Sequence, residues 1–413
     1  MGIFYRLTEL SLSNGNDEHS PDIFTLLKNT PALNRLELEN YAISWLQFES
    51  LHKNVAQLSV LLLNSVKTPQ QPYRNAVEPN SILKTLTIRH CTLGYDEQFH
   101  WIRYIVQKYS DLEHFTFFVL PVPDQRRVEI DEYHERLIMP LVDGLGTQLK
   151  TFVLKHGLFT HKLFQALDSK EYRLNKLGLY SLVTPEADQG LFQSHQATYL
   201  RELSLFRADF KSFKQFKVFK HLKSLKLSFG EDRNQVIQDH SMVSIALNEM
   251  LSELPKQLEE LVLVSCAVRI EPFVSSLPSQ IRSLTFDNTE LDSQVSTFIS
   301  DYCRRLHTLS LILCQPGLST ILLPDHRLSC FEIFSHDTQP IFMLTIGDQH
   351  HYYNMNRVLF RGLKGIKRYF GVQDTPAFAT RTADQDPINS TRPIIHLTCR
   401  SLSALYINTR LAI

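Results

Sequence analysis

The six residues "LKSLKL" (222–227) have the form L-x-x-L-x-L, in which the fourth and sixth positions alternate with polar residues. Alternation at period two predicts a short β-strand that buries one face. The first leucine of the form reaches the same core from the bend before the strand. A buried aliphatic side chain contributes roughly 1.5–3 kcal/mol, yet one such unit cannot enclose a core alone. The stretch therefore predicts that similar units stack beside it.

The same form recurs along almost the whole chain. The matching hexapeptides occupy residues 7–12, 33–38, 55–60, 83–88, 112–117, 149–154, 174–179, 200–205, 222–227, 258–263, 281–286, 306–311, 328–333 and 402–407. Up to the repeat at residue 328, most intervals fall within the roughly 20–29 residues of a leucine-rich repeat. We therefore predict an α/β leucine-rich-repeat solenoid, a curved horseshoe with parallel strands on its concave face and helices or irregular segments on its convex face.

The repeats suggest how the chain is organised into domains. Residues 1–333 are expected to form the solenoid, residues 334–401 an inserted β-hairpin and flexible loop that cap its end, and residues 402–413 the final repeat strand. Within the insertion, 340–356 predicts two strands around a Gly-Asp turn, and 371–393 is rich in turn formers and predicts a mobile loop.

Two repeats are long enough for a full helix in the return segment. An apolar face indicates one helix over 128–146, which Pro140 would kink, and a second helix over 239–255, which ends at Pro255. The shorter repeats are expected to return through one or two helical turns or irregular chain.

Composition excludes several classes of protein. Lys and Arg together number 43 and so do Asp and Glu, so net charge does not indicate a polyanion binder. The six cysteines include no C-x-x-C pair, which argues against a zinc ribbon or a dense disulfide framework. The sequence shows neither a signal peptide nor an apolar run long enough to span a membrane. We expect a soluble intracellular protein, in the cytoplasm, the nucleus or both.

No sequence motif points to catalysis. HExxH, GxSxG, P-loop and GxGxxG patterns are absent. His350 and His351 resemble a metal-ligand pair, but neighbouring residues of a strand point to opposite faces, so we expect no shared ion. Cys91 follows its strand at the Asn/Cys position of the repeat and is expected to pack inward, as are Cys266 and Cys314. We therefore predict a non-enzymatic protein without cofactor or metal.

The solvent-facing positions of the predicted strands are the candidate binding residues. These are the third and fifth residues of each hexapeptide and the residue after it. Aromatic residues recur at this last position in the middle of the chain, with lysines nearby, and the candidate partner-binding residues are Phe118, Lys155, Lys176, Tyr180, Phe206 and Lys226. Exposed aromatics surrounded by charge resemble a protein-binding hot spot. A second interpretation stays open, in which flanking loops cover the rings.

The segment "FKSFKQFKVFKH" (210–221) places a lysine and an aromatic residue at every third position. An α-helix would spread this period around its axis, whereas a 3₁₀-like turn would line up each residue type. We predict that the phenylalanines pack inward and that a basic ridge of Lys211, Lys214, Lys217 and Lys220 faces solvent on the convex side. Such a ridge suggests an alternative function, in which the chain binds a nucleic acid or an acidic surface. We favour this interpretation less, because the net charge of the chain is zero.

Repeats such as "LKTLTIRHC" and "LEELVLVSC" resemble those of the F-box/leucine-rich-repeat proteins, especially the fungal ones, which have a ribonuclease-inhibitor-like repeat domain. The resemblance covers nearly the whole chain, although its motifs are generic to the repeat class. In that family an F-box docks on Skp1 within a cullin ubiquitin ligase, and the repeats hold the protein to be degraded. The resemblance implies a substrate-recognition element that binds a protein on the concave face. Because the first repeat begins at Leu7, no F-box is visible, so docking on Skp1 and cullin is a weaker expectation. A small-GTPase regulator is a further alternative, suggested by architecture alone.

Overall fold

The computed structural model divides the chain into two compact units, Met1–Ser204 and Leu205–Ile413. The residues that it describes are 4, 6–14, 23–67, 72–73, 75–121, 132, 134–155, 159–179, 185–206, 213–229, 242–272, 279–314, 320–334, 341–346, 349–354, 394–407 and 410–411. The predicted boundaries at residues 333 and 401 follow the repeats rather than this division, and they stay a prediction.

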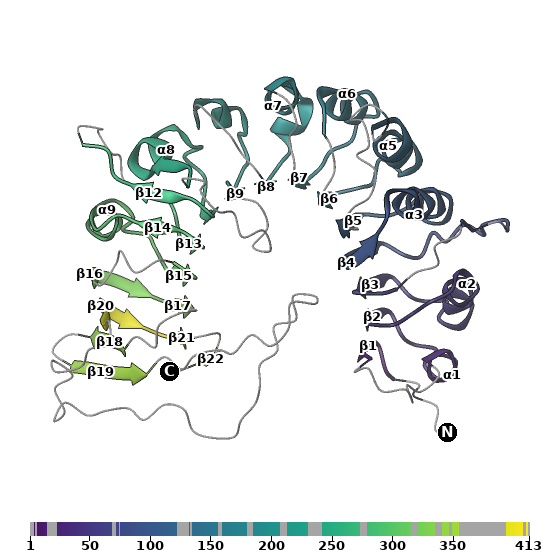
Figure 1. The fold of residues 1–413 in the computed structure, drawn as a ribbon, viewed down its shortest axis with the longest axis horizontal. Helices are drawn as coiled ribbons and strands as arrows, with labels where there is room; N and C mark the ends of the chain where they lie inside the picture. Colours follow the sequence, from purple (N-terminus) through teal and green to yellow (C-terminus); the bar gives the residue numbers. More distant parts are fainter. Residues whose placement is uncertain are drawn as a thin grey trace. The chain divides into compact units, whose positions relative to one another are not determined.

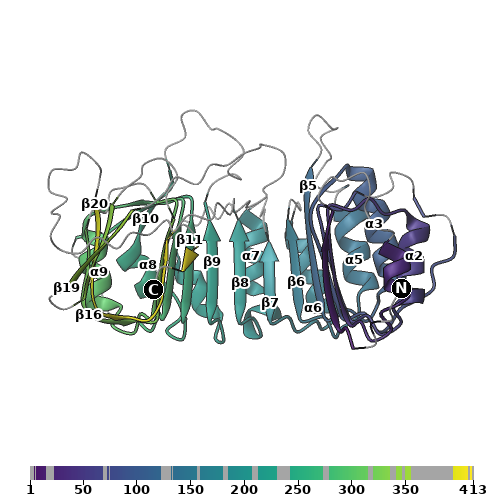
Figure 2. The ribbon, with the colours of Figure 1, turned by 90° about the horizontal axis from the view of Figure 1, so that it is seen from below.

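The strands of the N-terminal unit form a parallel sheet in the order of the chain (Figure 1). They are β1 (Glu9–Ser13), β2 (Arg35–Glu39), β3 (Val60–Asn64), β4 (Thr85–Leu93), β5 (His114–Pro121), β6 (Thr151–Lys155), β7 (Lys176–Leu179) and β8 (Glu202–Phe206), the last of which reaches the division. Figure 2 shows β6 and β7 as arrows that point the same way. Parallel neighbours with a crossover between them are the arrangement that a repeat solenoid requires.

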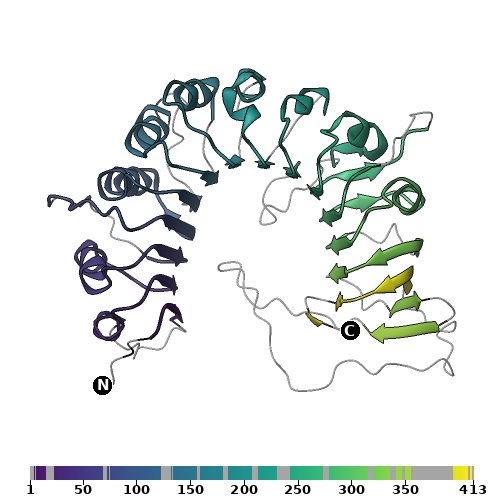
Figure 3. The same cartoon turned by 180° about the vertical axis from the view of Figure 1, so that it is seen from behind.

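The helices of this unit lie on one side of its strands, in Figure 1 and in the reverse view of Figure 3. They are α1 (Ile23–Leu27), α2 (Trp45–Asn54), α3 (Tyr95–Lys108), the π-helical turn η1 (His134–Ile138), α5 (Met139–Gly144), α6 (His161–Ser169), α7 (Pro185–Gln193) and the 3₁₀ turn η2 (His195–Thr198). Alternate strand residues such as Leu36 and Leu38 are fully buried against them. The core therefore lies between one layer of strands and one layer of helices.

A repeated hydrogen-bond pattern sets the start of each strand. The residue before the strand offers a carbonyl that accepts two consecutive N–H groups of the next repeat. The N–H groups of Asn34 and Arg35 both donate to the Thr8 carbonyl at 2.9 and 3.0 Å, and those of Glu113 and His114 donate to Lys84 at the same two distances. Where neighbouring repeats use this acceptor position, their strands begin in register.

The C-terminal unit continues the parallel order through alternate strands (Figure 1). Its main strands are β9 (Ser224–Ser228), β11 (Glu260–Val264), β13 (Ser283–Asp287), β15 (Thr308–Ile312), β17 (Cys330–Phe334) and β21 (Leu405–Ile407), with β22 (Arg410–Leu411) antiparallel at the end. Two shorter sheets accompany them. One consists of β10 (Ser244–Ala246), β12 (Ala267–Arg269) and β14 (Glu290–Leu291), and the other consists of β16 (Thr320–Leu328), β20 (Ile394–Leu402), β18 (Ile341–Ile346) and β19 (Gln349–Asn354). The helices are η3 (Phe213–Val218), α8 (Leu247–Glu253) and α9 (Gln294–Tyr302).

Strand ends in both units use a left-handed backbone. Six residues have φ between 53° and 60°, and each lies two places after the last core residue of its strand: Asn40, Ser65, His90, Ser265, Asn288 and Leu313. The turn directs the following residue inward, and Cys91 and Cys266 at this next position are 1% and 0% exposed. The prediction that these two cysteines pack inward is confirmed, whereas Cys314 is only half-buried and shares a contact of 3.2 Å with the Thr289 hydroxyl.

The fold class predicted from the repeats is confirmed, since the chain is an α/β solenoid of the leucine-rich-repeat type. The predicted register of the third repeat is wrong. Its strand is Val60–Asn64 rather than part of 55–60, and the buried residues are Leu58, Leu61 and Leu63. The pairing of Arg35 with Val60 and of Val60 with Thr85 then gives even steps of 25 residues. Several overlapping aliphatic residues fit the pattern here, and only pairing with both neighbours selects one frame.

The helix predicted over 239–255 is only partly correct. Helix α8 covers Leu247–Glu253, but Ser244–Ala246 form strand β10, which pairs in parallel with Ala267–Arg269. Backbone pairing with the next repeat has replaced the first helical turns, and residues 239–241 of the predicted helix lie outside the described ranges. Within 128–146, the described helical residues are Glu132 and His134–Gly144, where a π-helical turn precedes Pro140 and Leu141 is buried.

The shorter repeats contain longer helices than the sequence predicted. Helices α2 and α3 have 10 and 14 residues. Ser44 caps α2 through a capping box with Gln47, a pattern that indicates a helix start. In the insertion, β18 and β19 pair antiparallel as predicted for 340–356, whereas the Gly-Asp turn and the loop 371–393 lie outside the described residues.

Candidate functional site

Phe118 is the fifth residue of strand β5, on the side of the sheet that faces away from the helices, and its side chain is half-buried. Strand pairing places it between Arg89 of β4 and Lys155 of β6. The exposed Arg89 directly precedes the left-handed residue His90, whose ring lies 5.6 Å from that of Phe118 in an edge-to-face arrangement. An aromatic ring between two cationic positions is therefore built into the register of three neighbouring strands.

The other predicted partner-binding residues of this unit differ in their surroundings. Lys176 of β7 forms an ion pair of 2.6 Å with Glu202 of β8, and both side chains are about half exposed. Its charge is therefore matched within the sheet. The backbone of Lys155 is placed at the end of β6, whereas its side chain and the whole of Tyr180 lie outside the described parts of the chain.

In the C-terminal unit, Phe206 and Lys226 lie on the neighbouring strands β8 and β9. Both side chains are half-buried, and Lys226 pairs in register with Val262. Two of the predicted residues are thus close in the sheet of each unit, Phe118 with Lys155 and Phe206 with Lys226.

The described part of the segment of alternating lysine and phenylalanine, residues 213–221, folds as predicted. Residues Phe213–Val218 form the 3₁₀ helix η3, in which Phe213 and Phe216 are buried, and Phe219 is buried just after it. The exposed lysines in the described part are Lys214, Lys217 and Lys220, while Lys211 falls outside it.

A buried carboxylate anchors the start of the basic ridge. Glu253 of α8 is only 8% exposed and accepts a hydrogen bond of 3.1 Å from the backbone N–H of Phe213. Its other oxygen lies 3.6 Å from the Lys214 ammonium. Outside the ridge, Lys223 is paired with Glu259 at 3.0 Å. These contacts reduce the net positive charge of the surface and weaken its match to a polyanion.

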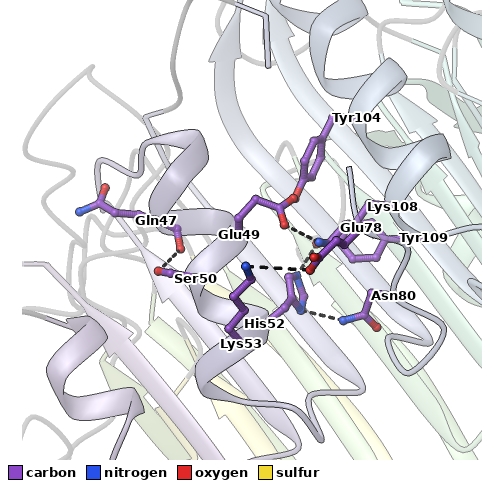
Figure 4. A network of polar contacts seen from close by, with 10 residues as sticks. All are labelled: Gln47, Glu49, Ser50, His52, Lys53, Glu78, Asn80, Tyr104, Lys108 and Tyr109. Atoms are coloured by element: carbon purple, nitrogen blue, oxygen red, sulfur yellow. Dashed lines mark hydrogen bonds and ion pairs between the residues drawn. The ribbon is translucent and has the colours of Figure 1, made fainter. Parts of the chain in front are cut away.

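Sequence analysis missed a buried polar network between helices α2 and α3 (Figure 4). The Lys108 ammonium lies 2.6 Å from a Glu49 carboxylate oxygen, and the Tyr104 hydroxyl donates to the other oxygen at 2.5 Å. The His52 Nε2 atom and the Tyr109 hydroxyl oxygen are 2.5 Å apart, and Figure 4 shows both side chains beside the Glu49–Lys108 pair. All five residues are less than 9% exposed.

A strand-connecting segment completes the network from outside the helices. The Asn80 amide lies 3.1 Å from His52 Nδ1, and the Asn80 backbone N–H donates to the Lys108 carbonyl at 2.6 Å. Lys53 and Glu78 form an exposed ion pair of 4.0 Å nearby. The sequence did contain a signal, because Glu49 and His52 share the i, i+3, i+4, i+7 face of α2 with Trp45 and Phe48.

The buried network has the chemistry of a structural element. Burial and the neighbouring Lys108 charge lower the pKa of His52 to about 3, so His52 stays neutral at physiological pH. Burial raises the pKa of Tyr104 and of Tyr109 well above the ordinary value. Burial likewise raises the pKa of the Cys91 thiol to about 12, which removes the thiolate that a reactive cysteine needs. The neutral histidine, the neutral tyrosines and the Lys108–Glu49 ion pair form their polar contacts with one another. This arrangement is that of a structural network rather than of a site that binds substrate.

Acid is expected to destabilise the N-terminal unit through His52. The unfolded side chain has a pKa near 6.5 and the folded one about 3, so the unfolded state binds one more proton between these values. The contribution of His52 to the free energy of unfolding is therefore fully present above pH 6.5. It falls as the pH decreases toward 3, by about 2 kcal/mol at pH 5. Urea unfolding at pH 7 and pH 5 measures the loss. The His52→Gln variant should lose about 2 kcal/mol less, and the exposed control His161→Gln should match wild type. Equal pH dependence in all three proteins would contradict the prediction.

The chain matches no protein-family model, and no curated protein matches it at a significant level. Within the described ranges, no group of three or more His, Cys, Asp or Glu side chains is arranged to hold a metal ion. None of the described helices has both the length and the apolar character that a membrane span needs.

Proposed function

We propose that this chain is a non-catalytic protein-binding module that captures its partner on the side of the parallel sheet that faces away from the helices. The observation that carries the proposal is the placement of Phe118 in register between Arg89 and Lys155. A large aromatic side chain with cationic neighbours is the composition found at the centre of protein interfaces. The surface extends along the neighbouring strands, whose spacing of about 4.8 Å adds area with each repeat.

The resemblance of the repeats to F-box/leucine-rich-repeat proteins supports a more specific role. We propose that the captured partner is a substrate for ubiquitin-dependent degradation and that this chain is the recognition part of an SCF-type ubiquitin ligase. An intracellular location follows from that role. The solenoid architecture is compatible with this proposal, while the choice among functions of the repeat class rests on the resemblance.

The first test compares partner capture by wild type and surface variants. Tagged full-length chain is used to purify partners from cells of the native organism, and the bound proteins are quantified by mass spectrometry. The Phe118→Ala variant and the Phe206→Ala variant should each bind the specific partner about 30-fold less tightly, since a central aromatic contributes at least about 2 kcal/mol. Tyr199→Ala, at a residue 38% exposed outside the strands, is the matched control.

Two results separate the general proposal from the specific one. Unchanged capture by both phenylalanine variants would overturn the binding surface. Co-elution of Skp1 and cullin with wild type would support the ligase role, whereas their absence alongside a Phe118-dependent partner would leave a binding module without that role.

A further inference from the structure

The row formed by the fifth residues of strands β2 to β6 changes in charge from one end to the other. Pairing places Glu39 beside Asn64, Asn64 beside Arg89, Arg89 beside Phe118 and Phe118 beside Lys155. The described members are half-buried or exposed. A single line across five strands therefore runs from acidic, through polar, to cationic, aromatic and cationic positions.

Two charged side chains of this row, those of Arg89 and Glu39, leave room for an external partner. Arg89 is exposed and is part of no ion pair shown among the described side chains. Among the described hydrogen bonds, the Glu39 carboxylate accepts only a long contact of 3.5 Å from the Asn64 amide. Lys176 and Arg35, in contrast, already have carboxylate neighbours, Glu202 and Glu9. Arg89 and the Glu39 carboxylate thus differ from the charged first residues of β1, β2, β7 and β8, which form ion pairs with a neighbouring strand.

The spacing of the row matches one peptide conformation closely. Neighbouring strands lie about 4.8 Å apart, so positions two strands apart, such as Lys155 and Arg89, are separated by roughly 9.6 Å. The same step leads from Arg89 to Glu39. A polyproline II helix rises about 3.1 Å per residue with three residues per turn, so residues i, i+3 and i+6 share one edge at steps of roughly 9.3 Å. An extended β-strand, whose side chains alternate at period two, does not match these steps.

We propose that this row binds a proline-rich segment of a partner protein in the polyproline II conformation, with acidic residues at i and i+3 and a basic residue at i+6. The acidic residues lie over the register positions of Lys155 and Arg89, and the basic residue lies over the register position of Glu39. The residues between the two acidic positions rest on Phe118, because aromatic rings are the usual platform for polyproline II segments. This inference rests on the proposed function and specifies the partner's chemistry.

The probe that tests it is the fluorescein-labelled peptide Glu-Pro-Pro-Glu-Pro-Pro-Lys, together with the peptide of reversed chain order. Fluorescence anisotropy with the full chain measures affinity at low salt. We expect either the probe or its reversed-order form to bind at least ten-fold more tightly than the charge-reversed peptide Lys-Pro-Pro-Lys-Pro-Pro-Glu. The Arg89→Glu variant should lose at least ten-fold in affinity, and changing the central Glu of the probe to Lys should restore most of it. Arg103→Glu, at an exposed arginine of helix α3, is the matched control.

Each outcome supports the inference or overturns it. Restoration by the exchanged charge supports it, since loss of folding could not be rescued by a peptide. Equal affinity for the probe and its charge-reversed counterpart, no binding in either chain direction, or equal effects of Arg89→Glu and Arg103→Glu would overturn it. In those cases the proposed function stands if capture of the cellular partner still depends on Phe118, and it falls if that capture is unchanged in Phe118→Ala and Phe206→Ala.

Discussion

Replacing Lys108 by alanine is expected to lower the free energy of unfolding of the N-terminal unit by about 3–5 kcal/mol. The change leaves the Glu49 carboxylate buried between α2 and α3 without its ammonium partner, which lies 2.6 Å away in the native chain. An uncompensated buried charge costs about this much because the interior solvates it poorly. Urea-induced unfolding followed by tryptophan fluorescence measures the effect, since Trp45 and Trp101 pack in the same seam at a ring distance of 4.9 Å.

Two further variants separate burial from charge. Lys53→Ala removes the exposed ion pair with Glu78 and should change stability by less than about 0.5 kcal/mol. The double variant Glu49→Leu/Lys108→Met replaces the buried pair by apolar groups of similar size and should recover most of the loss, because both desolvation costs disappear. A Lys108→Ala cost as small as that of Lys53→Ala would show that the pair does not stabilise the seam.

Replacing Leu61 by alanine is expected to cost about 2–5 kcal/mol, whereas replacing Leu62 should cost less than about 1 kcal/mol. Leu61 is fully buried and pairs in register with Leu36 and Leu86, so its removal leaves a cavity between three repeats. Leu62 is half-buried on the opposite face of the same strand. The two variants remove the same atoms one residue apart, which makes each the control for the other.

This pair of variants also tests the strand register directly. In the frame suggested by the hexapeptide 55–60, Val60 would be a core residue and Leu61 would face solvent. In the structure Val60 faces away from the core and is half-buried. Urea unfolding of Val60→Ala should therefore show a small cost, and a cost for Val60→Ala that exceeds the cost for Leu61→Ala would contradict the register.

The hexapeptide period predicted most of the strands correctly. Leu225 and Leu227 are buried in β9 as the form at 222–227 requires, and Leu36 and Leu38 are buried in β2. The 3₁₀ period of three likewise predicted that Phe216 packs inward and Lys217 faces solvent. These predictions succeeded because burial alternates along the backbone at a period that each local conformation sets.

The candidate site was less predictable than the fold. Phe118 was chosen from its position in the repeat, but the exposed Arg89 beside it belonged to a repeat that the search for aromatic residues did not single out. Lys176 was chosen for its charge, which Glu202 on the next strand already neutralises. A contact across strands depends on which residues are paired, and the loop lengths that set pairing vary between repeats.

The sequence by itself determined that leucine-rich units repeat, that their strands are parallel, and that the lysines and phenylalanines near residue 215 separate onto opposite faces. Only the tertiary structure decided the frame of β3, the strand β10 in place of the first helical turns, and the buried contact of Lys108 with Glu49. The physical reason is the range of the forces involved. Alternation of apolar residues acts within one segment, whereas backbone pairing and burial of charge depend on a neighbour in another repeat, as in the pairing of Ser244 with Ala267 and of Arg35 with Val60.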